Sequence, residues 1–179
     1  MRFEKVKRFA DSDINLPYRA TKYSAGYDFE VAEDIVIPSA FKELKKIAAE
    51  PHSKIDLADM EQLTKSLGVR PTLVPTGIKC KLEDNKYLKL AVRSSLPLKS
   101  WLILANGEGL IDADYFGNAD NDGEIFFQLI NLGPIDIQLH RGDRIGQGVI
   151  LEYFITEDDH PGGIRTGGLG STKWKLYLL

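Results

Sequence analysis

Hydrophobic residues in this chain gather in short segments that are separated by Gly, Pro, Asn or Asp. One segment, Ile135 to Leu139, alternates apolar and polar positions with a period of two, which is typical of a half-buried strand. The strands predicted from this pattern cover residues 34–39, 72–82, 86–95, 100–105, 124–132, 135–140 and 144–155. Many short strands at close spacing predict a mainly β fold, an all-β barrel or jelly roll.

Residues 40–70 depart from this pattern and predict a small helical insertion. Apolar residues recur at helical spacing in residues 39–51 and again in residues 56–68. Asp56 is placed as an N-cap, and Gly68 follows the second helix where a C-terminal glycine is expected. We therefore expect one domain over residues 1–179, with a helical hairpin inserted into it.

The composition suits one compact domain, or one domain with an insert, since 43% of the 179 residues are hydrophobic. A formal charge of -3 and the absence of a Lys/Arg run argue against a nucleic-acid surface. Cys80 is the only cysteine, which excludes an intrachain disulfide and argues against a zinc cluster. The chain has neither the apolar core of a signal peptide nor an apolar run of ~18 residues. We therefore expect a cytoplasmic protein without a membrane segment.

The segment NGEGLIDADY (106–115) carries more polar groups than a turn requires. Gly and Asn suit a hairpin tip with positive φ, whereas Asp112, Asp114 and Tyr115 exceed that need. A carboxylate fixed there could take a proton from a water molecule that attacks phosphorus. The Asn106 amide and the hairpin backbone could match a nucleobase edge, and Tyr115 could lie against a sugar. The alternative is that both aspartates are solvated turn residues.

Other segments offer groups that could hold phosphate oxygens. RSSLPLKS (93–100) combines a guanidinium with two hydroxyls, or is only a strand end with a serine-rich turn. RTGGLGSTKW (165–174) could wrap a phosphate chain with backbone N–H groups while Arg165 supplies a charged fork, or could be a flexible tail. Gln147 could donate to a ligand, or could be an ordinary polar residue of a strand.

Taken together and in this order, these segments resemble the five motifs of the trimeric dUTPases, of the bacterial or phage type. The match spans about residues 20–174 apart from the insert, and five motifs in the right order argue strongly against chance. The matching segments are SAGYDF (24–29), RSS (93–95), NGEGLIDADYFG (106–117), GDRIGQ (142–147) and RTGGLGST (165–172), with VPTGI (74–78) where the family has a similar strand. The resemblance implies the family's β-clip or jelly-roll barrel, with a flexible glycine-rich arm over about residues 160–179.

The resemblance also implies an activity, which is the hydrolysis of dUTP to dUMP and pyrophosphate. In the family, water attacks the α-phosphorus with Mg²⁺ as the cofactor. This hydrolysis limits uracil in DNA and supplies dUMP for thymidylate synthesis. The family's sites combine motifs from three chains. The expected partners are therefore dUTP and two further copies of this chain in a homotrimer.

Carried over residue by residue, the resemblance makes Asp112 the base that activates water and Asp28 the carboxylate that helps to hold Mg²⁺ through water. The substrate-binding positions that it implies are Arg93, Ser94, Ser95, Asn106, Gly109, Ile111, Tyr115, Gln147, Arg165, Gly167, Gly168, Leu169, Gly170, Ser171 and Thr172. Asp114 lies one alternation beyond Asp112. In a pleated strand it would point to the opposite face, so we do not expect it to be the base.

The chain departs from the family pattern in several places. Leu169 stands where the family commonly has a Phe that stacks on uracil, and Trp174 or Phe116 could substitute for it. The fifth motif is a residue shorter after Arg165 than usual. The link over residues 117–127 is longer than usual, and the insert is not part of the minimal fold.

Two other functions fit parts of the pattern. A dCTP deaminase, or a bifunctional dCTP deaminase/dUTPase, shares the fold and an RSS-like motif, although GLIDADY (109–115) argues against it. Phage-type dUTPases can also act on partner proteins, and an added helical pair could be a docking surface. The alternative for the pair is that it only shields part of the barrel or of the trimer.

Overall fold

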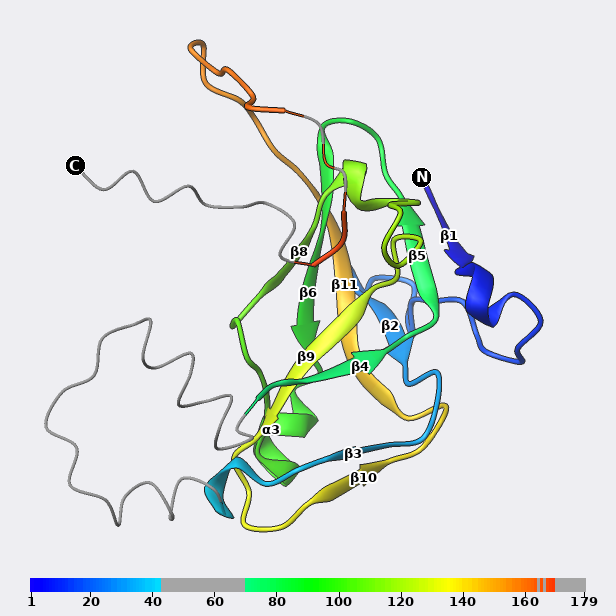
Figure 1. Ribbon diagram of the computed structural model, residues 1–179, viewed down its shortest axis with the longest axis vertical. Coiled ribbons are helices and arrows are strands. Elements are labelled where there is room, and N and C mark those ends of the chain that lie inside the picture. Colours follow the sequence, from blue (N-terminus) through cyan, green and yellow to red (C-terminus); the bar gives the residue numbers. More distant parts are fainter. Residues whose placement is uncertain (43–69, 164, 166, 170–179) are drawn as a thin grey trace, which may run out of the picture.

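The computed structural model describes residues 1–42, 70–163, 165 and 167–169, and its architecture is mainly β, as predicted (Figure 1). The strands and helices in chain order are β1 (Arg2–Lys5), η1 (Lys7–Phe9), β2 (Tyr27–Glu30), β3 (Ile35–Ile37), β4 (Thr72–Pro75), β5 (Ile78–Lys81), β6 (Lys86–Val92), α3 (Ser95–Ser100), β7 (Leu102–Leu104), β8 (Gly109–Ile111), η2 (Ala113–Tyr115), β9 (Phe126–Asn131), β10 (Ile137–Leu139) and β11 (Arg144–Glu152). Both η elements are 3₁₀ helices. Among the described residues, no helix is long and apolar enough to cross a membrane.

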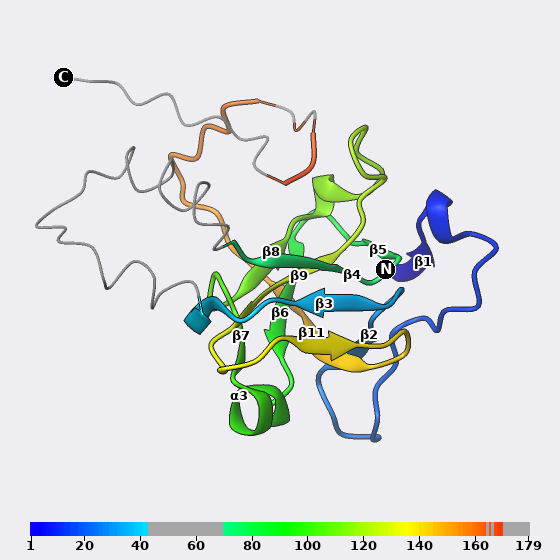
Figure 2. The ribbon, with the colours of Figure 1, turned by 60° about the horizontal axis from the view of Figure 1, so that its bottom comes forward.

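The strands form two larger antiparallel sheets and two short ribbons. The 4-stranded sheet has the order β2-β11-β6-β8, and the 3-stranded sheet has the order β4-β9-β7. β1 pairs with β5, and β3 pairs with β10. In both ribbon views α3 lies at one end of the strands, away from the N-terminal β1 (Figures 1 and 2).

The side chains of the larger sheets meet in a common core. β9 alternates between the buried Phe127 and Leu129 and more exposed neighbours. The Phe127 ring packs against Phe29 of β2, with 5.8 Å between ring centroids. β11 passes this contact at Gly146, where a Cβ would overlap the Phe127 ring. The glycine in GDRIGQ is therefore required by the close approach of a strand to an aromatic side chain.

Each strand segment predicted from the hydrophobic pattern contains a strand, and the predicted segment at residues 72–82 contains two. The chain turns between them at Gly77, where φ is +68°. The prediction missed β1, β2 and β8 as strands, and it missed α3, which follows the RSS segment. The predicted helical insertion lies outside the described residues, apart from a helical start at residues 40–42.

The prediction of a hairpin around NGEGLIDADY is wrong. β7 pairs with β9 and β8 pairs with β6, so the two arms belong to different sheets. The connection is a tight turn with φ +71° at Gly107, whose N–H donates to the Leu104 carbonyl at 3.0 Å. This segment therefore carries the chain from one sheet to the other.

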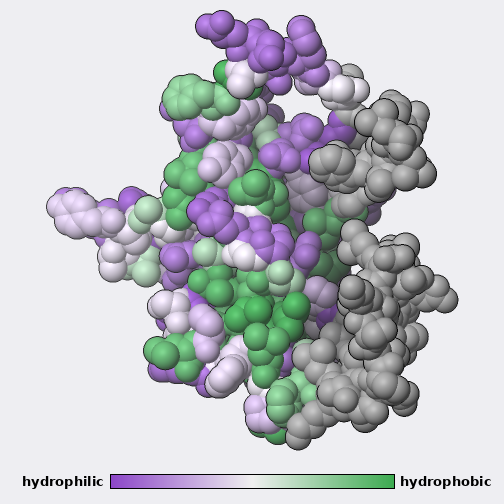
Figure 3. Space-filling model, turned by 90° about the vertical axis from the view of Figure 1, so that its left-hand side faces the viewer, coloured by the Kyte–Doolittle hydropathy of each residue, from purple (hydrophilic) through white to green (hydrophobic). Residues whose placement is uncertain are grey.

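The surface differs between the two ends of the molecule. Figure 3 shows apolar side chains over much of the lower half of one face, whereas the upper end is hydrophilic. Large apolar side chains are exposed at Leu98 in α3, at Trp101 directly after it and at Leu110 in β8. Exposed apolar area of this kind is typical of surfaces that bind another protein chain.

Candidate active site

The first, second and fourth sequence motifs meet at one end of the 4-stranded sheet. Asp28 of β2 lies opposite Gln147 of β11 in the antiparallel register. Gln147 covers Gly26, since a Cβ at that glycine would lie 2.5 Å from the Gln147 Oε1. Asp28 is 8% exposed, and its Oδ2 accepts a hydrogen bond from Arg144 Nη1 at 3.3 Å. The sheet thus fixes a carboxylate, an amide and a guanidinium side by side.

The RSS segment joins this group from the neighbouring strand. Val92 pairs with Gly146, and the Arg93 N–H donates to the Ile145 carbonyl at 3.2 Å. The chain then turns into α3 at Ser95, and Ser94 is exposed without a capping hydrogen bond from its side chain. We call Asp28, Arg93, Ser94, Ser95 and Gln147 the cradle group. Its donors suit phosphate oxygens, because a guanidinium and hydroxyls are gathered around backbone that strand pairing holds in place.

The third motif lies at the other end of β6. Asp112 follows β8 in extended conformation, with φ -79° and ψ 160°, and η2 begins at the next residue. The Asp112 side chain is 55% exposed, and its Oδ2 accepts from Arg165 Nη2 at 2.8 Å. An exposed, extended carboxylate at the start of a turn can reach a water molecule.

Asp114 does not point away from Asp112, which corrects the expectation from strand pleating. Arg165 Nε donates to Asp114 Oδ1 at 2.8 Å while Nη2 of the same guanidinium binds Asp112. The expectation failed because residues 113–115 form a 3₁₀ helix instead of continuing the strand, which turns both carboxylates towards one cation. The two acids form one anionic group on the surface.

Tyr115 is held inside the fold behind these acids. Its side chain is 4% exposed, and its hydroxyl donates to the Glu124 carbonyl at 2.9 Å and accepts from Asn121 Nδ2 at 2.7 Å. Burial raises the pKa of Tyr115. The Arg165 guanidinium carbon lies 5.7 Å from the centre of its ring. The contact of Tyr115 with a sugar stays a prediction.

Of the remaining positions of the third motif, two are buried against β6 and one is exposed. Gly109 pairs with Leu90 of β6, and a Cβ at the glycine would lie 3.0 Å from the Leu90 Cβ. Ile111 is buried in the core, opposite Leu88. Asn106 is exposed in the turn between β7 and β8. Uracil recognition by these positions stays a prediction.

Part of the fifth motif lies beside the acids. The Gly168 N–H donates to Asp120 Oδ2 at 2.7 Å, Gly167 is also buried, and Leu169 is 47% exposed. Gly170, Ser171 and Thr172, also expected to bind substrate, lie outside the described residues. Of the described arm residues, therefore, Arg165 contacts the third motif, and Gly168 contacts Asp120 in the link that follows it.

The cradle group and Asp112 are far apart within one chain. Ile111 pairs with Leu88, so Asp112 is level with position 87 of β6, whereas Arg93 follows the last residue of that strand. At the rise of a β-strand, this separation is ~20 Å. In Figure 1, α3 lies at the lower end of β6, opposite the turn that follows β8. One chain alone does not bring the expected base to the expected phosphate cradle.

The cradle group fits a magnesium ion that is held largely by other ligands. Asp28 offers one nearly buried carboxylate, and no group of three or more potential metal ligands occurs among the described residues. Mg²⁺ retains several waters and is commonly bound by one or two carboxylates together with substrate phosphates. A lone Asp28 therefore suits contact through water, as the resemblance implies.

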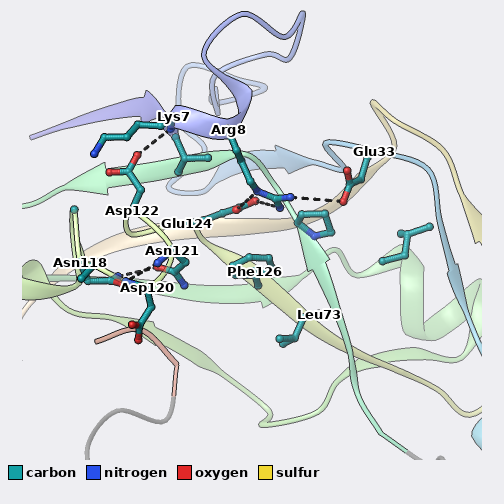
Figure 4. Close-up of a pocket in the computed structure, with 15 residues that line it drawn as sticks. Lys7, Arg8, Glu33, Leu73, Asn118, Asp120, Asn121, Asp122, Glu124 and Phe126 are labelled. Atoms are coloured by element: carbon teal, nitrogen blue, oxygen red, sulfur yellow. Dashed lines mark hydrogen bonds and ion pairs between the residues drawn. The ribbon is translucent and has the colours of Figure 1, made fainter. Parts of the chain in front are cut away.

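Two cavities flank the third motif, and only the smaller contains a predicted site residue. That cavity, about 620 Å³, is lined by Asp112 and Asp114 and by Phe116 and Tyr153. The larger, about 710 Å³, is bordered by Arg8 and Glu124, which form a bidentate pair at 2.6 and 2.8 Å (Figure 4). The smaller cavity is therefore the one that contains the predicted base, Asp112.

Sequence reasoning missed several side chains that contact predicted site residues, and two of them are charged. Arg144 binds Asp28, and its only signal was its place within GDRIGQ. Asp120 binds Gly168, and the signal was the unusual length of the link after the third motif. Both contacts join residues that are far apart in sequence.

Comparisons with known proteins identify the family of this chain. The family model for dUTPase matches residues 54–161. The deoxyuridine 5'-triphosphate nucleotidohydrolase of Lactococcus lactis is 33% identical over 172 residues, which is 95% of this chain and 95% of that protein. The Rickettsia typhi protein of the same name is 34% identical over 149 residues, which is 83% of this chain and 78% of that protein.

Solved structures show the same relationship. The dUTPase from Streptococcus mutans superimposes with a TM-score of 0.67 and 32% identity, over 87% of this chain and 98% of its own. A mutant dUTPase from phage phi11 of S. aureus shares the fold, with a TM-score of 0.59 and 16% identity over 90% of this chain and 96% of its own. The described part of the chain therefore has the dUTPase fold, and the chain belongs to the dUTPase family.

Proposed function

We propose that the protein hydrolyses dUTP to dUMP and pyrophosphate in the cytoplasm, with Asp112 as the base. The relatives at 33% and 34% identity are named as deoxyuridine 5'-triphosphate nucleotidohydrolases. The single observation that carries the assignment within this chain is the exposed Asp112 carboxylate on the turn after β8, beside the arm that supplies Arg165.

The proposed mechanism gives each group a role. The Asp112 carboxylate takes a proton from water as the water oxygen attacks the α-phosphorus, and pyrophosphate leaves. Arg93, with the hydroxyls of Ser94 and Ser95, binds phosphate oxygens, and Gln147 assists from the adjacent strand. Arg165 adds a further cation for the negative charge of the triphosphate.

Mg²⁺ is the proposed cofactor, and it would neutralise charge on the phosphates and on the departing pyrophosphate. Asp28 would orient it by accepting hydrogen bonds from its water ligands. Arg144 holds the Asp28 carboxylate in place at 3.3 Å. The phage phi11 structure, which coordinates a structural Mg(II) ion, supports a magnesium site in this fold.

The active protein is proposed to be a homotrimer with shared sites. The distance of ~20 Å between Asp112 and Arg93 within one chain is far beyond the span of an α-phosphate and its attacking water. A second copy that presents its cradle group to Asp112 removes this gap. Closed cyclic symmetry then repeats the same junction at every interface.

The test is pyrophosphate release measured separately with dUTP, dCTP, dTTP and UTP, at equal enzyme and Mg²⁺ concentrations. We expect turnover of dUTP to dominate, with dUMP as the nucleotide product. A dCTP deaminase would instead convert dCTP to a uracil nucleotide without needing to release pyrophosphate. Preferential loss of the amino group from dCTP would overturn the proposal, as would equal rates with UTP.

A further inference from the structure

The link at residues 117–123, one residue after η2, has a shape that its own side chains hold. Asn118 Oδ1 accepts from the Asn121 N–H at 3.2 Å. Asn118 Nδ2 donates to the Tyr115 carbonyl at 2.9 Å. One amide side chain thus closes the turn of the link and joins it to the end of η2. We call residues 117–123 the Asn loop.

Hydrogen bonds within the Asn loop fix the orientation of the Asn121 amide. Its Oδ1 accepts from the Gly123 N–H at 3.1 Å and from Asn118 Nδ2 at 2.8 Å (Figure 4). A backbone N–H can only donate, so the amide oxygen must face Gly123 and the amide nitrogen must face the other way. That nitrogen lies 2.7 Å from the Tyr115 hydroxyl. Asn121 is therefore a hydrogen-bond donor to the phenol.

The Tyr115 hydroxyl is held by two partners of opposite kind. It accepts from Asn121 Nδ2 at 2.7 Å and donates to the Glu124 carbonyl at 2.9 Å. Since a carbonyl can only accept, the phenol proton is directed at Glu124 and an oxygen lone pair at Asn121. The ring is therefore anchored at its backbone and at its hydroxyl, and it cannot swing without breaking a hydrogen bond.

The two anchors of the hydroxyl differ in how deeply they are built into the fold. The Glu124 side chain is 1% exposed and pairs with Arg8, and the next residue, Ile125, is buried in the core. Asn121 lies on the Asn loop and is partly exposed. Asn121 is therefore the anchor that a substitution can remove without disturbing the core.

The anchored ring lies one turn from the proposed base. The Tyr115 N–H donates to the Asp112 carbonyl at 3.2 Å. Residues three apart in a 3₁₀ turn lie on the same side of it. In the proposed reaction, the α-phosphorus that is attacked near Asp112 carries the sugar through its 5′ oxygen. A side chain one turn from the base is therefore within reach of the sugar.

Building on the proposed function, we propose that Asn121 is a positioning residue for sugar selection and acts through the Tyr115 hydroxyl. A ring that is fixed at both ends is a rigid boundary of the sugar site, so the extra oxygen of a ribose meets a clash that a deoxyribose avoids. A ring that can swing back accommodates the 2′-hydroxyl at lower cost. Asn121 therefore raises the preference for dUTP over UTP without touching either nucleotide.

Asn121→Ala removes the donor to the phenol and leaves the ring in place. We expect the ratio of kcat/KM for dUTP to kcat/KM for UTP to fall by about three- to tenfold, the size of effect that one net hydrogen bond supports. Most of this change should be a gain with UTP, because a rigid ring does not obstruct a deoxyribose. Pyrophosphate release with each nucleotide, at equal enzyme and Mg²⁺ concentrations, measures both values. An unchanged ratio would overturn the positioning role.

Tyr115→Phe tests whether Asn121 acts through the hydroxyl. The phenylalanine ring keeps its size and loses both anchors, so this variant should lower the ratio at least as far as Asn121→Ala does. In the Tyr115→Phe background, Asn121→Ala should then lower the ratio no further, since the two side chains act as one unit. If Asn121 only supports the loop, the same additional loss appears in both backgrounds, and that result would contradict the proposal.

Lys79→Met is the control for a general loosening of the Asn loop. Lys79 Nζ binds Asp122 Oδ2 at 2.9 Å, and the two side chains are only 11% and 17% exposed. The substitution removes this tie between the loop and β5 while Asn121 keeps its bond to the phenol. We expect lower thermal stability and an unchanged ratio of dUTP to UTP turnover. A ratio that falls as far as in Asn121→Ala would assign the effect to the loop as a whole and not to Asn121.

The wild-type ratio separates this proposal from the proposed function. Equal rates of the wild type with dUTP and UTP would overturn the proposed function, and sugar selection with it. A wild type that prefers dUTP, together with an Asn121→Ala variant that prefers it equally, overturns the role of Asn121 alone. Thermal unfolding and native mass establish that each variant is folded. If Asn121→Ala does not fold, an unchanged ratio in Tyr115→Phe overturns the anchored ring.

Discussion

The cradle group and the Asp112 turn are built in opposite ways. In the cradle group, Asp28 and Gln147 lie on the paired strands β2 and β11, and the Arg93 backbone, just after β6, is bonded to β11. Ser94 and Ser95 follow at the start of α3. The Asp112 turn consists of a 3₁₀ helix, a loop and the arm, and hydrogen bonds that involve side chains join these three parts. Regular strand pairing fixes positions more firmly than turns and loops do.

This difference matches what the proposed chemistry requires of each region. Phosphate oxygens and Mg²⁺ need ligands that stay in place, whereas the base must exchange an ion pair for a water molecule. The side chains of Asp112 and Asp114 are 55% and 57% exposed, while Asp28 is 8% exposed. We therefore expect changes at the turn to alter turnover and changes at the cradle to alter metal dependence and stability.

The largest expected effect comes from Asp112→Asn, which removes the base without changing the size of the side chain. We predict that kcat for dUTP falls by about 10²- to 10⁴-fold, because an amide cannot take the proton from water. Binding of dUTP, measured by calorimetry, should change little. Asp84→Asn, another acid that lines the same cavity, is the control. Near-normal turnover of the Asp112 variant would remove the turn from the chemistry.

The cradle is probed next by Asp28→Asn. We expect the Mg²⁺ concentration for half-maximal activity to rise by about ten- to a hundredfold, as is usual when a group that orients metal ligands is lost. Titration of activity with Mg²⁺ at saturating dUTP measures this shift. The Asp112→Asn protein, assayed at its residual rate, should keep the wild-type Mg²⁺ requirement. An unchanged requirement in Asp28→Asn would place the metal elsewhere.

The same contrast explains what sequence could and could not predict. Strand segments such as residues 86–95 and 144–155 could be predicted because they are rich in Ile, Val, Leu and aromatic residues. β1 is rich in charge, and β8 lies within a segment whose Gly and Asn residues indicated a hairpin tip, so neither was predicted as a strand. The order of the motifs indicated which residues form the cradle group. Strand pairing then brings two of them, Asp28 and Gln147, together.

The turn could not be predicted in the same detail. The split of NGEGLIDADY between two sheets depends on pairing with the distant strands β6 and β9. The direction of Asp114 depends on a 3₁₀ helix that forms where the strand pattern predicts pleating. The contacts of Arg165 and Asp120 join segments about fifty residues apart, and no local periodicity encodes them.

Gly146→Ala tests the strand-built region through stability. The added Cβ would overlap the Phe127 ring and lie 2.8 Å from the Ala91 carbonyl oxygen, so the strands must separate. We expect a loss of about 3 kcal/mol in the free energy of unfolding, the upper end of the usual cost of overpacking a dense core. Urea unfolding at one protomer concentration measures it. Gly162→Ala, with open space around the added Cβ, is the control, and equal losses in the two would contradict the packing argument.

Tyr115→Phe gives the smallest expected effect and reports on the turn. The loss of its hydrogen bonds to the Glu124 carbonyl and Asn121 should cost about 1 kcal/mol at pH 8. Burial raises the pKa of Tyr115, so the unfolded chain loses the phenol proton first, near pH 10. Its contribution is therefore complete below about pH 10 and is lost as pH rises through the folded pKa. Urea unfolding at pH 8, 10 and 11 should show the difference from wild type shrinking with pH. Tyr153→Phe is the control, because the exposed Tyr153 hydroxyl donates to the Asp84 carbonyl. If the stability difference between Tyr115→Phe and the wild type stayed constant with pH, the pKa of Tyr115 would be the same in the folded and the unfolded chain.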